Sequence, residues 1–103
     1  MDGFDAGRLD DAIHGKIRLA IMAYLSGAGS ASFPILKAAI GASDGNLSVH
    51  LRKLEEAGHV TSTKAFDGLK PMTTLTLTDT GREAWIAYLD QLRLLLVGRL
   101  PNG

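Results

Sequence analysis

The chain opens with two stretches in which apolar residues recur at helical spacing. Within residues 9–26 they repeat at intervals of three and four, as on one face of an α-helix, at Ile17, Ala20, Ile21, Tyr24 and Leu25. The pattern is interrupted at residues 14–15, and a Gly-Ala-Gly sequence at 27–29 ends it. Residues 32–40 repeat the pattern over a shorter length, with Pro34 in the first turn, where its missing N–H is harmless. We predict helices over about residues 9–26 and 32–40.

A third helical stretch follows after about three residues and differs in its polar face. Leu47, Leu51 and Leu54 fall at i, i+4 and i+7, and Ser43 stands at the N-cap position. The other positions carry short polar side chains and two cations in place of the Glu–Lys pairs of an ordinary solvated face, namely Asp44, Asn46, Ser48, Val49, Arg52 and Lys53. We predict a helix over about residues 44–57, ended by Gly58, with a polar face suited to a binding partner.

Beyond residue 60 the apolar period changes from helical to alternating. Residues 60–66 and 72–77 are rich in β-branched and aromatic residues, and Asp67-Gly68 supplies a turn between them. Two cations, Lys64 and Lys70, flank this turn. We predict a β-hairpin over residues 60–77 with a basic tip.

The last stretch predicts a long helix over about residues 79–97, and the sequence Thr78-Asp79-Thr80 offers an N-cap for it. Its apolar stripe consists of Trp85, Tyr88, Leu89, Leu92, Leu95 and Leu96, and Ile86, Leu94 and Val97 widen it. Such a helix spans roughly 25 Å and carries more apolar surface than a small monomer can cover. We therefore predict a dimerisation helix. Leu19 and Met22, which fall off the main stripe of the first helix, are expected to join the dimer contact.

Length and composition limit the class of protein. With 103 residues, 46% of them hydrophobic and 21% charged, the chain is predicted to form one globular domain over residues 1–103. No apolar run approaches the 18 or more residues that would suggest a membrane-spanning helix. The N-terminus is acidic and does not resemble a signal peptide, so we expect a cytoplasmic protein without a membrane partner.

The chemistry-bearing residues give little support to catalysis or to a cofactor. The chain has no cysteine, which excludes disulfides, thiolate metal sites and a cysteine nucleophile. Its three histidines lack ligand-like spacing, its serines and threonines lack a recognisable base partner, and the Gly-Ala-Gly sequence lacks the lysine of a phosphate loop. We expect no enzyme activity, no cofactor and no metal site.

Charge is balanced in sum and uneven along the chain. The net charge is zero, yet residues 1–13 carry −3, and residues 14–70 carry seven cations against four acidic residues, a balance of +3. An uneven distribution of this kind permits a nucleic-acid surface in the middle of the chain.

Three helices, a hairpin and a final helix are the element order of a winged helix-turn-helix. The segments HGKIRLAIMAYL, SDGNLSVHLRKLEEAGHV and KAFDGLKPMTTLTLTDTGRE, taken together, resemble small transcription regulators related to the MarR and ArsR winged-helix groups. The resemblance covers about residues 9–90. It implies a mainly α fold with a β-hairpin wing and a C-terminal dimerisation helix, in which the third helix reads DNA.

ArsR-like metal sensors use cysteines, and larger MarR-like regulators have extra terminal helices beside an effector pocket. A small-molecule effector is therefore possible but unsupported here.

The polar face of the third helix and the hairpin supply the expected contacts to double-stranded DNA. These residues are Ser43, Asp44, Asn46, Ser48, Val49, His50, Arg52, Lys53, Lys64 and Lys70. Arg52 or Lys53 can donate to guanine or phosphate and Asn46 can pair with adenine. Asp44 could accept from cytosine N4 and Val49 could meet a thymine methyl group.

Other roles stay open for several of these residues. Asp44 would also stabilise the start of its helix without DNA, and His50, which precedes a core leucine, could pack at the edge of the core. Lys64 and Lys70 could be solvated at a hairpin tip.

The sequence favours a homodimeric, sequence-specific DNA-binding transcriptional regulator, a repressor that binds a pseudo-palindromic operator. The alternative is a winged-helix module that uses the same surfaces for protein contact, which the zero net charge favours slightly.

Overall fold

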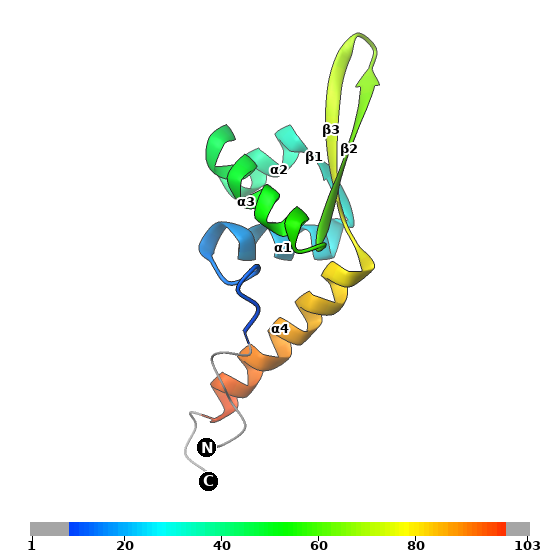
Figure 1. The fold of residues 1–103 in the computed structure, drawn as a ribbon. Helices are drawn as coiled ribbons and strands as arrows, with labels where there is room; N and C mark the ends of the chain where they lie inside the picture. Colours follow the sequence, from blue (N-terminus) through cyan, green and yellow to red (C-terminus); the bar gives the residue numbers. More distant parts are fainter. Residues whose placement is uncertain (1–8, 99–103) are drawn as a thin grey trace.

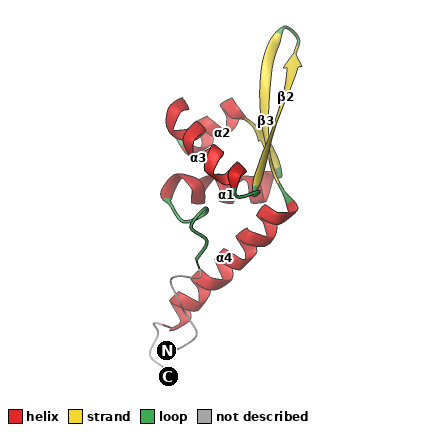
Figure 2. Cartoon of the chain, in the orientation of Figure 1, coloured by secondary structure: helices red, strands yellow, loops and turns green. Residues whose placement is uncertain are grey.

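The computed structural model describes residues 9–98, which form four helices and a three-stranded antiparallel sheet (Figures 1 and 2). The elements, in chain order, are α1 (Lys16–Ala28), β1 (Ser30–Ser32), α2 (Phe33–Ile40), α3 (Asp44–Glu56), β2 (Val60–Asp67), β3 (Lys70–Leu77) and α4 (Asp79–Gly98). The predicted fold class, mainly α with a β-hairpin wing and a long C-terminal helix, is confirmed. No described helix is long and apolar enough to cross a membrane.

The core lies where α1, α2 and α3 meet the inner end of the sheet. Its fully or nearly buried apolar side chains are Ile13, Ile21, Met22, Leu25, Leu36, Leu47, Leu51, Leu54, Val60, Leu75, Leu77 and Tyr88. The i, i+4, i+7 leucines of α3 all belong to this set, so the opposite face of α3 must point to solvent.

The first helix begins later than its apolar pattern predicted, at Lys16 instead of residue 9. The preceding residues form a separate turn built on Asp10, whose backbone oxygen accepts from the amides of Ile13 and His14. Its carboxylate accepts from Ala12 N at 2.8 Å. The turn ends at residue 15, where the helix starts afresh, so the 9–26 assignment was wrong at its start. We name residues 10–14 the N-terminal turn.

The short strand β1 was not predicted from the sequence. It pairs with the inner half of β3, Ser30 opposite Thr76 and Ser32 opposite Thr74. Three residues are too few to show an alternating pattern, and their role is decided by a partner more than forty residues away. The central strand of the sheet is therefore β3, in the order β1-β3-β2.

The wing consists of β2, β3 and the two residues between them. Asp67 pairs with Lys70, so the turn is formed by Gly68 and Leu69, one residue later than predicted. Gly68 has φ 67°, a left-handed conformation that suits a two-residue hairpin turn. The outer part of the wing projects beyond α2 and α3 (Figure 1).

The start of α4 is anchored to the turn that follows α3. The hydroxyl of Thr78 accepts from Gly81 N at 2.8 Å, as an N-cap does, and donates to Gly58 O at 2.6 Å. From there α4 runs away from the sheet (Figure 1). Tyr88, two turns further on, is the residue of α4 that is buried in the core.

Candidate nucleic-acid interface

The solvent face of α3 carries most of the predicted DNA contacts. Asn46, Ser48, Arg52 and Lys53 are exposed, and Val49 keeps 49% of its surface accessible. These side chains belong to a helix fixed through its buried leucines, so the face is presented by a rigid element. An exposed set of hydrogen-bonding groups, two cations and one small apolar side chain can contact phosphates and base edges.

Two predicted contacts at the start of α3 already have partners within the chain. Ser43 is the N-cap, and its hydroxyl oxygen accepts from Asn46 N at 3.2 Å. Asp44 forms an ion pair with Lys37 of α2, with 2.8 Å between the carboxylate and the ammonium. Both groups of this pair are exposed, so it is weakly stabilising and can open. Asp44 thus has a stabilising partner within the chain, Lys37, whereas its contact with DNA stays a prediction.

His50 is held by an arginine that the sequence did not single out. Nη1 of Arg18 lies 3.0 Å from Nδ1 of His50. Because a guanidinium can only donate, Nδ1 must accept and the neutral ring carries its proton on Nε2. Burial, followed by the nearby charges of Arg18 and Lys53, lowers the pKa of His50 below its usual value of 6.5. His50 is half-buried, and its DNA contact also stays a prediction.

The same guanidinium ties α3 to the N-terminal turn. Nε of Arg18 donates to Ala12 O at 2.7 Å, and Nη2 donates to His14 O at 3.0 Å and Asp11 O at 3.3 Å. Arg18 therefore bridges α3 and a turn more than thirty residues away in the sequence. No sequence motif marks this arginine, because its partners come from separate elements.

A shallow hollow separates α3 from the wing, and we call it the α3–wing groove. It has a volume of about 230 Å³ and is lined by Phe33, Ser48, Leu51, Arg52, Glu55, Ser62, Thr73 and Leu75. Ser48 and Arg52 form one wall and the hydroxyls of Ser62 and Thr73 the other. Ser62 donates to the Glu55 carboxylate at 2.7 Å across the groove, so one wall is fixed to the other.

The register of the wing decides which side chains share the groove. Residues directly opposite in an antiparallel pair lie on one face of the sheet, and the faces alternate along each strand. Ser62, Thr73 and Leu75 line the groove, so the face that they define also includes Lys64, opposite Thr73, and Phe66, opposite Pro71. We call these six residues the groove face of the wing. Lys70 pairs with Asp67 on the other face.

The predicted dimer residues divide into buried and exposed groups. Met22 is fully buried in the core, and Tyr88 is 3% exposed, with its hydroxyl 2.8 Å from His14 Nδ1. These two cannot form a surface contact in this structure, so the prediction was wrong for both. Leu19, Trp85, Leu92 and Leu95 are partly buried, and Leu89 and Leu96 are exposed. Trp85 stacks on Tyr88 with ring centroids 6.0 Å apart.

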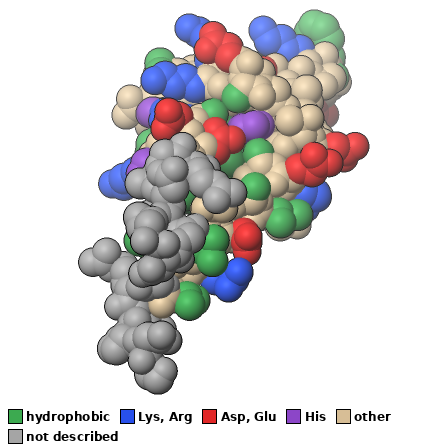
Figure 3. Space-filling view, turned by 60° about the horizontal axis from the view of Figure 1, so that its bottom comes forward, with side chains coloured by type: hydrophobic (Ala, Val, Ile, Leu, Met, Phe, Trp, Pro, Cys, Tyr) green, Lys and Arg blue, Asp and Glu red, His purple; other side chains and the backbone are tan. Residues whose placement is uncertain are grey.

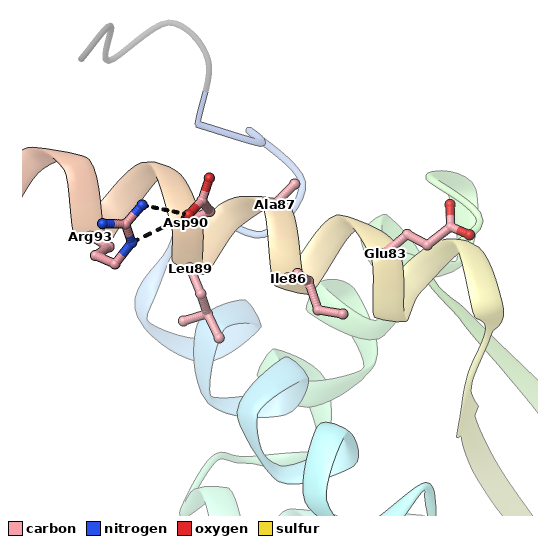
Figure 4. Close-up of a pocket in the computed structure, with 6 residues that line it drawn as sticks. All are labelled: Glu83, Ile86, Ala87, Leu89, Asp90 and Arg93. Carbon is pink, nitrogen blue, oxygen red and sulfur yellow. Dashed lines mark hydrogen bonds and ion pairs between the residues drawn. The ribbon is translucent and has the colours of Figure 1, made fainter. Parts of the chain in front are cut away.

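The exposed side of α4 is hollowed and partly apolar. A surface hollow of about 530 Å³ is lined by Glu83, Ile86, Ala87, Leu89, Asp90 and Arg93. Ile86 and Leu89 point to the same side of the helix, whereas Asp90 and Arg93 form an ion pair at 3.0 Å (Figure 4). Ile86 is 61% and Leu96 63% exposed. In the view of Figure 3, apolar side chains reach the surface among charged groups of both signs.

No group of three potential metal ligands is found within residues 9–98. His59 is instead paired with the Asp10 carboxylate at 2.9 Å, which fastens the N-terminal turn to the turn that follows α3. The hydrogen bonds of Arg18, Glu55 and His59 thus join separate elements of the fold.

Comparison with known proteins places this geometry in a family. Residues 17–96 match the family described as winged helix DNA-binding domain. An uncharacterized protein of Methanocaldococcus jannaschii is 36% identical over 76 residues, which cover 74% of this chain and 83% of the relative. The structure of a transcriptional regulator homologue from Pyrococcus horikoshii OT3 aligns with a TM-score of 0.80 and 30% identity, covering 84% of this chain and 86% of that one.

A more distant structure shares the fold. A putative transcriptional regulator of the MarR family from Porphyromonas gingivalis W83 aligns with a TM-score of 0.65 and 22% identity, over 86% of this chain and 85% of that one. The matched family covers α1 through most of α4, including the α3–wing groove. The chain therefore belongs to the winged helix DNA-binding domain family, and its fold is the one found in MarR-family transcriptional regulators.

Proposed function

We propose that the protein is a homodimeric repressor that binds a pseudo-palindromic operator, with α3 in the major groove and the wing against the DNA backbone. One observation carries the proposal: the exposed polar face of α3 continues across the α3–wing groove onto the groove face of the wing. Arg52 and Ser48 stand on one side, Ser62 and Thr73 on the other, and Lys64 lies further out on the same face.

The residues of this surface are assigned different roles. Asn46 and Arg52, exposed on α3, are proposed to contact base edges, where bidentate hydrogen bonds distinguish adenine and guanine. Lys53 and Lys64 are proposed to contact phosphates, which position the protein without reading sequence. Lys70 pairs with Asp67 on the other face of the wing, so its contribution is proposed to be smaller.

Dimerisation is proposed to use the exposed side of α4. Ile86, Leu89 and Leu96 leave apolar surface open on a helix that runs away from the core. A second copy related by two-fold symmetry would cover this surface and place two recognition helices in successive major grooves, about 34 Å apart. Half-sites spaced by one helical turn of DNA follow from that symmetry.

Selection of binding sites from random DNA, followed by binding titrations with the purified protein, tests the DNA-binding part. We expect affinity to fall steeply with salt, because each phosphate contact releases counterions. Arg52→Ala should weaken the selected site by about 1–3 kcal/mol more than random DNA. Lys64→Ala should weaken both alike, and Lys70→Ala, its matched control on the other face, should weaken them less. A protein that ignores DNA at low salt would instead support a protein-contact module.

Sedimentation equilibrium tests the dimer separately. Ile86→Glu buries a carboxylate in the proposed interface and should yield monomers. Ile35→Glu changes an isoleucine that is 56% exposed on α2, away from α4, and should leave association unchanged. Equal behaviour of the two variants would refute the α4 interface.

A further inference from the structure

The tip of the wing carries two large apolar side chains that the core does not cover. Phe66 is 76% exposed and Leu69 is 98% exposed. Single exposed apolar residues are ordinary, but here an aromatic ring stands near the end of a hairpin that projects past α2 and α3 (Figure 1). The fold does not use this ring for stability, because little of its surface is buried.

The two side chains differ in where they stand. Phe66 belongs to the groove face of the wing, directly opposite Pro71 and two residues beyond Lys64. Leu69 belongs to the two-residue turn and to neither strand. A strand rises about 3.3 Å per residue, which places Phe66 about 13 Å beyond Ser62, at the wall of the α3–wing groove.

The inference rests on the proposed function, because it takes DNA as the partner. The distance from Ser62 to Phe66 is similar to the spacing of neighbouring grooves in DNA. One turn of B-DNA measures about 34 Å, so the centre of a minor groove lies roughly 17 Å along the axis from that of the neighbouring major groove. With α3 in the major groove, the groove face of the wing would run from Ser62 across the phosphate backbone. Lys64 would stand at the phosphates and Phe66 near the minor groove.

We propose that Phe66 enters this minor groove as an apolar wedge and presses against a base step. Phenylalanine and other apolar side chains that enter the minor groove partly unstack a step and kink the duplex. The cost is lowest at flexible pyrimidine–purine steps, so the wedge selects sequence without hydrogen bonds to bases. Phe66 is thus a specificity-determining residue of the wing.

The charges around Phe66 favour DNA over an apolar protein surface as the occupant. Lys64 is its neighbour on the groove face, and the acidic residue of the tip, Asp67, lies on the other face with Lys70. Glu55, a carboxylate that lines the α3–wing groove, accepts a hydrogen bond from the Ser62 hydroxyl. An exposed ring beside a cation, with the carboxylates turned away or paired, complements a polyanion that offers stacked bases.

Fluorescence of 2-aminopurine, scanned through the DNA next to one half-site, tests the proposal with the full-length protein. Unstacking raises the fluorescence of this base, so one flanking step should brighten on binding. Phe66→Ala should remove the signal and lower affinity about five- to 150-fold. Leu69→Ala, a matched loss of an exposed apolar side chain from the turn, should keep the signal and stay within about twofold of the wild type.

Two further measurements sharpen the outcome. Replacing the brightened step by a stiff A-tract should weaken the wild type more than Phe66→Ala. Urea unfolding curves should be the same for both variants, because neither side chain is buried. Wild-type affinity and fluorescence in Phe66→Ala would overturn the wedge while leaving recognition by α3 intact. Equal losses in both alanine variants without brightening would also overturn it. Absence of DNA binding by the wild type would instead overturn the proposed function.

Discussion

Replacing Gly81 with alanine should destabilise the protein, although alanine is the better helix former. Gly81 is buried in the first turn of α4, where the backbone passes close to His59. A β-carbon at residue 81 would come closest to the carbonyl oxygen of His59, and it would lie 2.8 Å from the carbonyl carbon and 2.9 Å from Cα of the same residue, whereas ordinary contacts begin at 3.4 Å. The carbonyl carbon alone requires the two backbones to separate by 0.6 Å, the difference between 3.4 and 2.8 Å, and the nearer carbonyl oxygen requires more.

That separation strains a hydrogen-bonded corner. Thr78 N donates to His59 O at 3.0 Å, and the Thr78 hydroxyl is bonded to Gly58 O and Gly81 N. Overpacking costs about 1–3 kcal/mol and a weakened hydrogen bond about 0.5–1.5 kcal/mol, while helix propensity offsets up to about 1 kcal/mol. We expect a net loss of about 2 kcal/mol, which lowers Tm by roughly 8–16 °C in a domain of this size.

Urea denaturation at one fixed protein concentration measures this loss, since self-association would otherwise shift the midpoint. The control is Gly27→Ala in the last turn of α1, where a β-carbon meets nothing within 4 Å. This control should gain about 0.5–1 kcal/mol from helix propensity. If Gly81→Ala matches or exceeds the wild-type stability with an unchanged m-value, the close approach of α4 to His59 is not a constraint.

Three further changes test the side-chain contacts of Arg18, His50 and Tyr88. Arg18→Ala removes four hydrogen bonds and should cost about 1–3 kcal/mol in urea unfolding, whereas the exposed Lys16→Ala should change stability by less than about 0.5 kcal/mol. The lowered pKa of His50 means that the folded state binds fewer protons than the unfolded state below pH 6.5. The free energy of unfolding therefore carries no penalty from His50 above pH 6.5, and it decreases as the pH falls from 6.5 through the lower folded-state pKa. His50→Gln should therefore show a smaller drop in urea midpoint between about pH 7.5 and 5.5 than the wild type. Tyr88→Phe removes the hydroxyl bonded to His14 and should cost about 0.5–1.5 kcal/mol in the same assay.

Each of these expectations can fail by itself. Equal stabilities of Arg18→Ala and Lys16→Ala would mean that the guanidinium contacts add nothing. A pH dependence that survives unchanged in His50→Gln would assign it to other groups. A Tyr88→Phe protein as stable as the wild type would show that water replaces the hydroxyl contact.

The helical framework could be predicted because its signals are local. Ser32 and Ser43 each accept a hydrogen bond at the start of a helix, and Gly41 adopts the left-handed conformation that ends α2. Caps, turn residues and apolar spacing are decided within a few residues, so a single sequence contains them. The exposed polar face of α3 followed directly from the buried leucine stripe.

Features decided by distant partners were not predictable in the same way. The stripe of α4 includes Tyr88, which faces the core, and Leu89, which is exposed, and spacing alone did not separate them. Met22 fell off the main stripe of α1 but is buried, because α1 is surrounded on more than one side. Arg18 acquires its role from three backbone carbonyls and His50, none of which is marked by a sequence motif.

The two halves of β3 should open at different rates. Thr74, Leu75 and Thr76 have strands on both sides, whereas residues 70–73 have β2 alone as a neighbour. In native-state hydrogen exchange the amides of the inner half should exchange only through nearly global unfolding, whereas those of the outer half should exchange through local fraying. A tip that frays at little cost can adjust its twist to a bound duplex, but ordering it consumes part of the binding free energy. A cross-strand link that stiffened residues 64–73 would therefore tighten binding to a matching duplex and narrow the range of duplex shapes accepted.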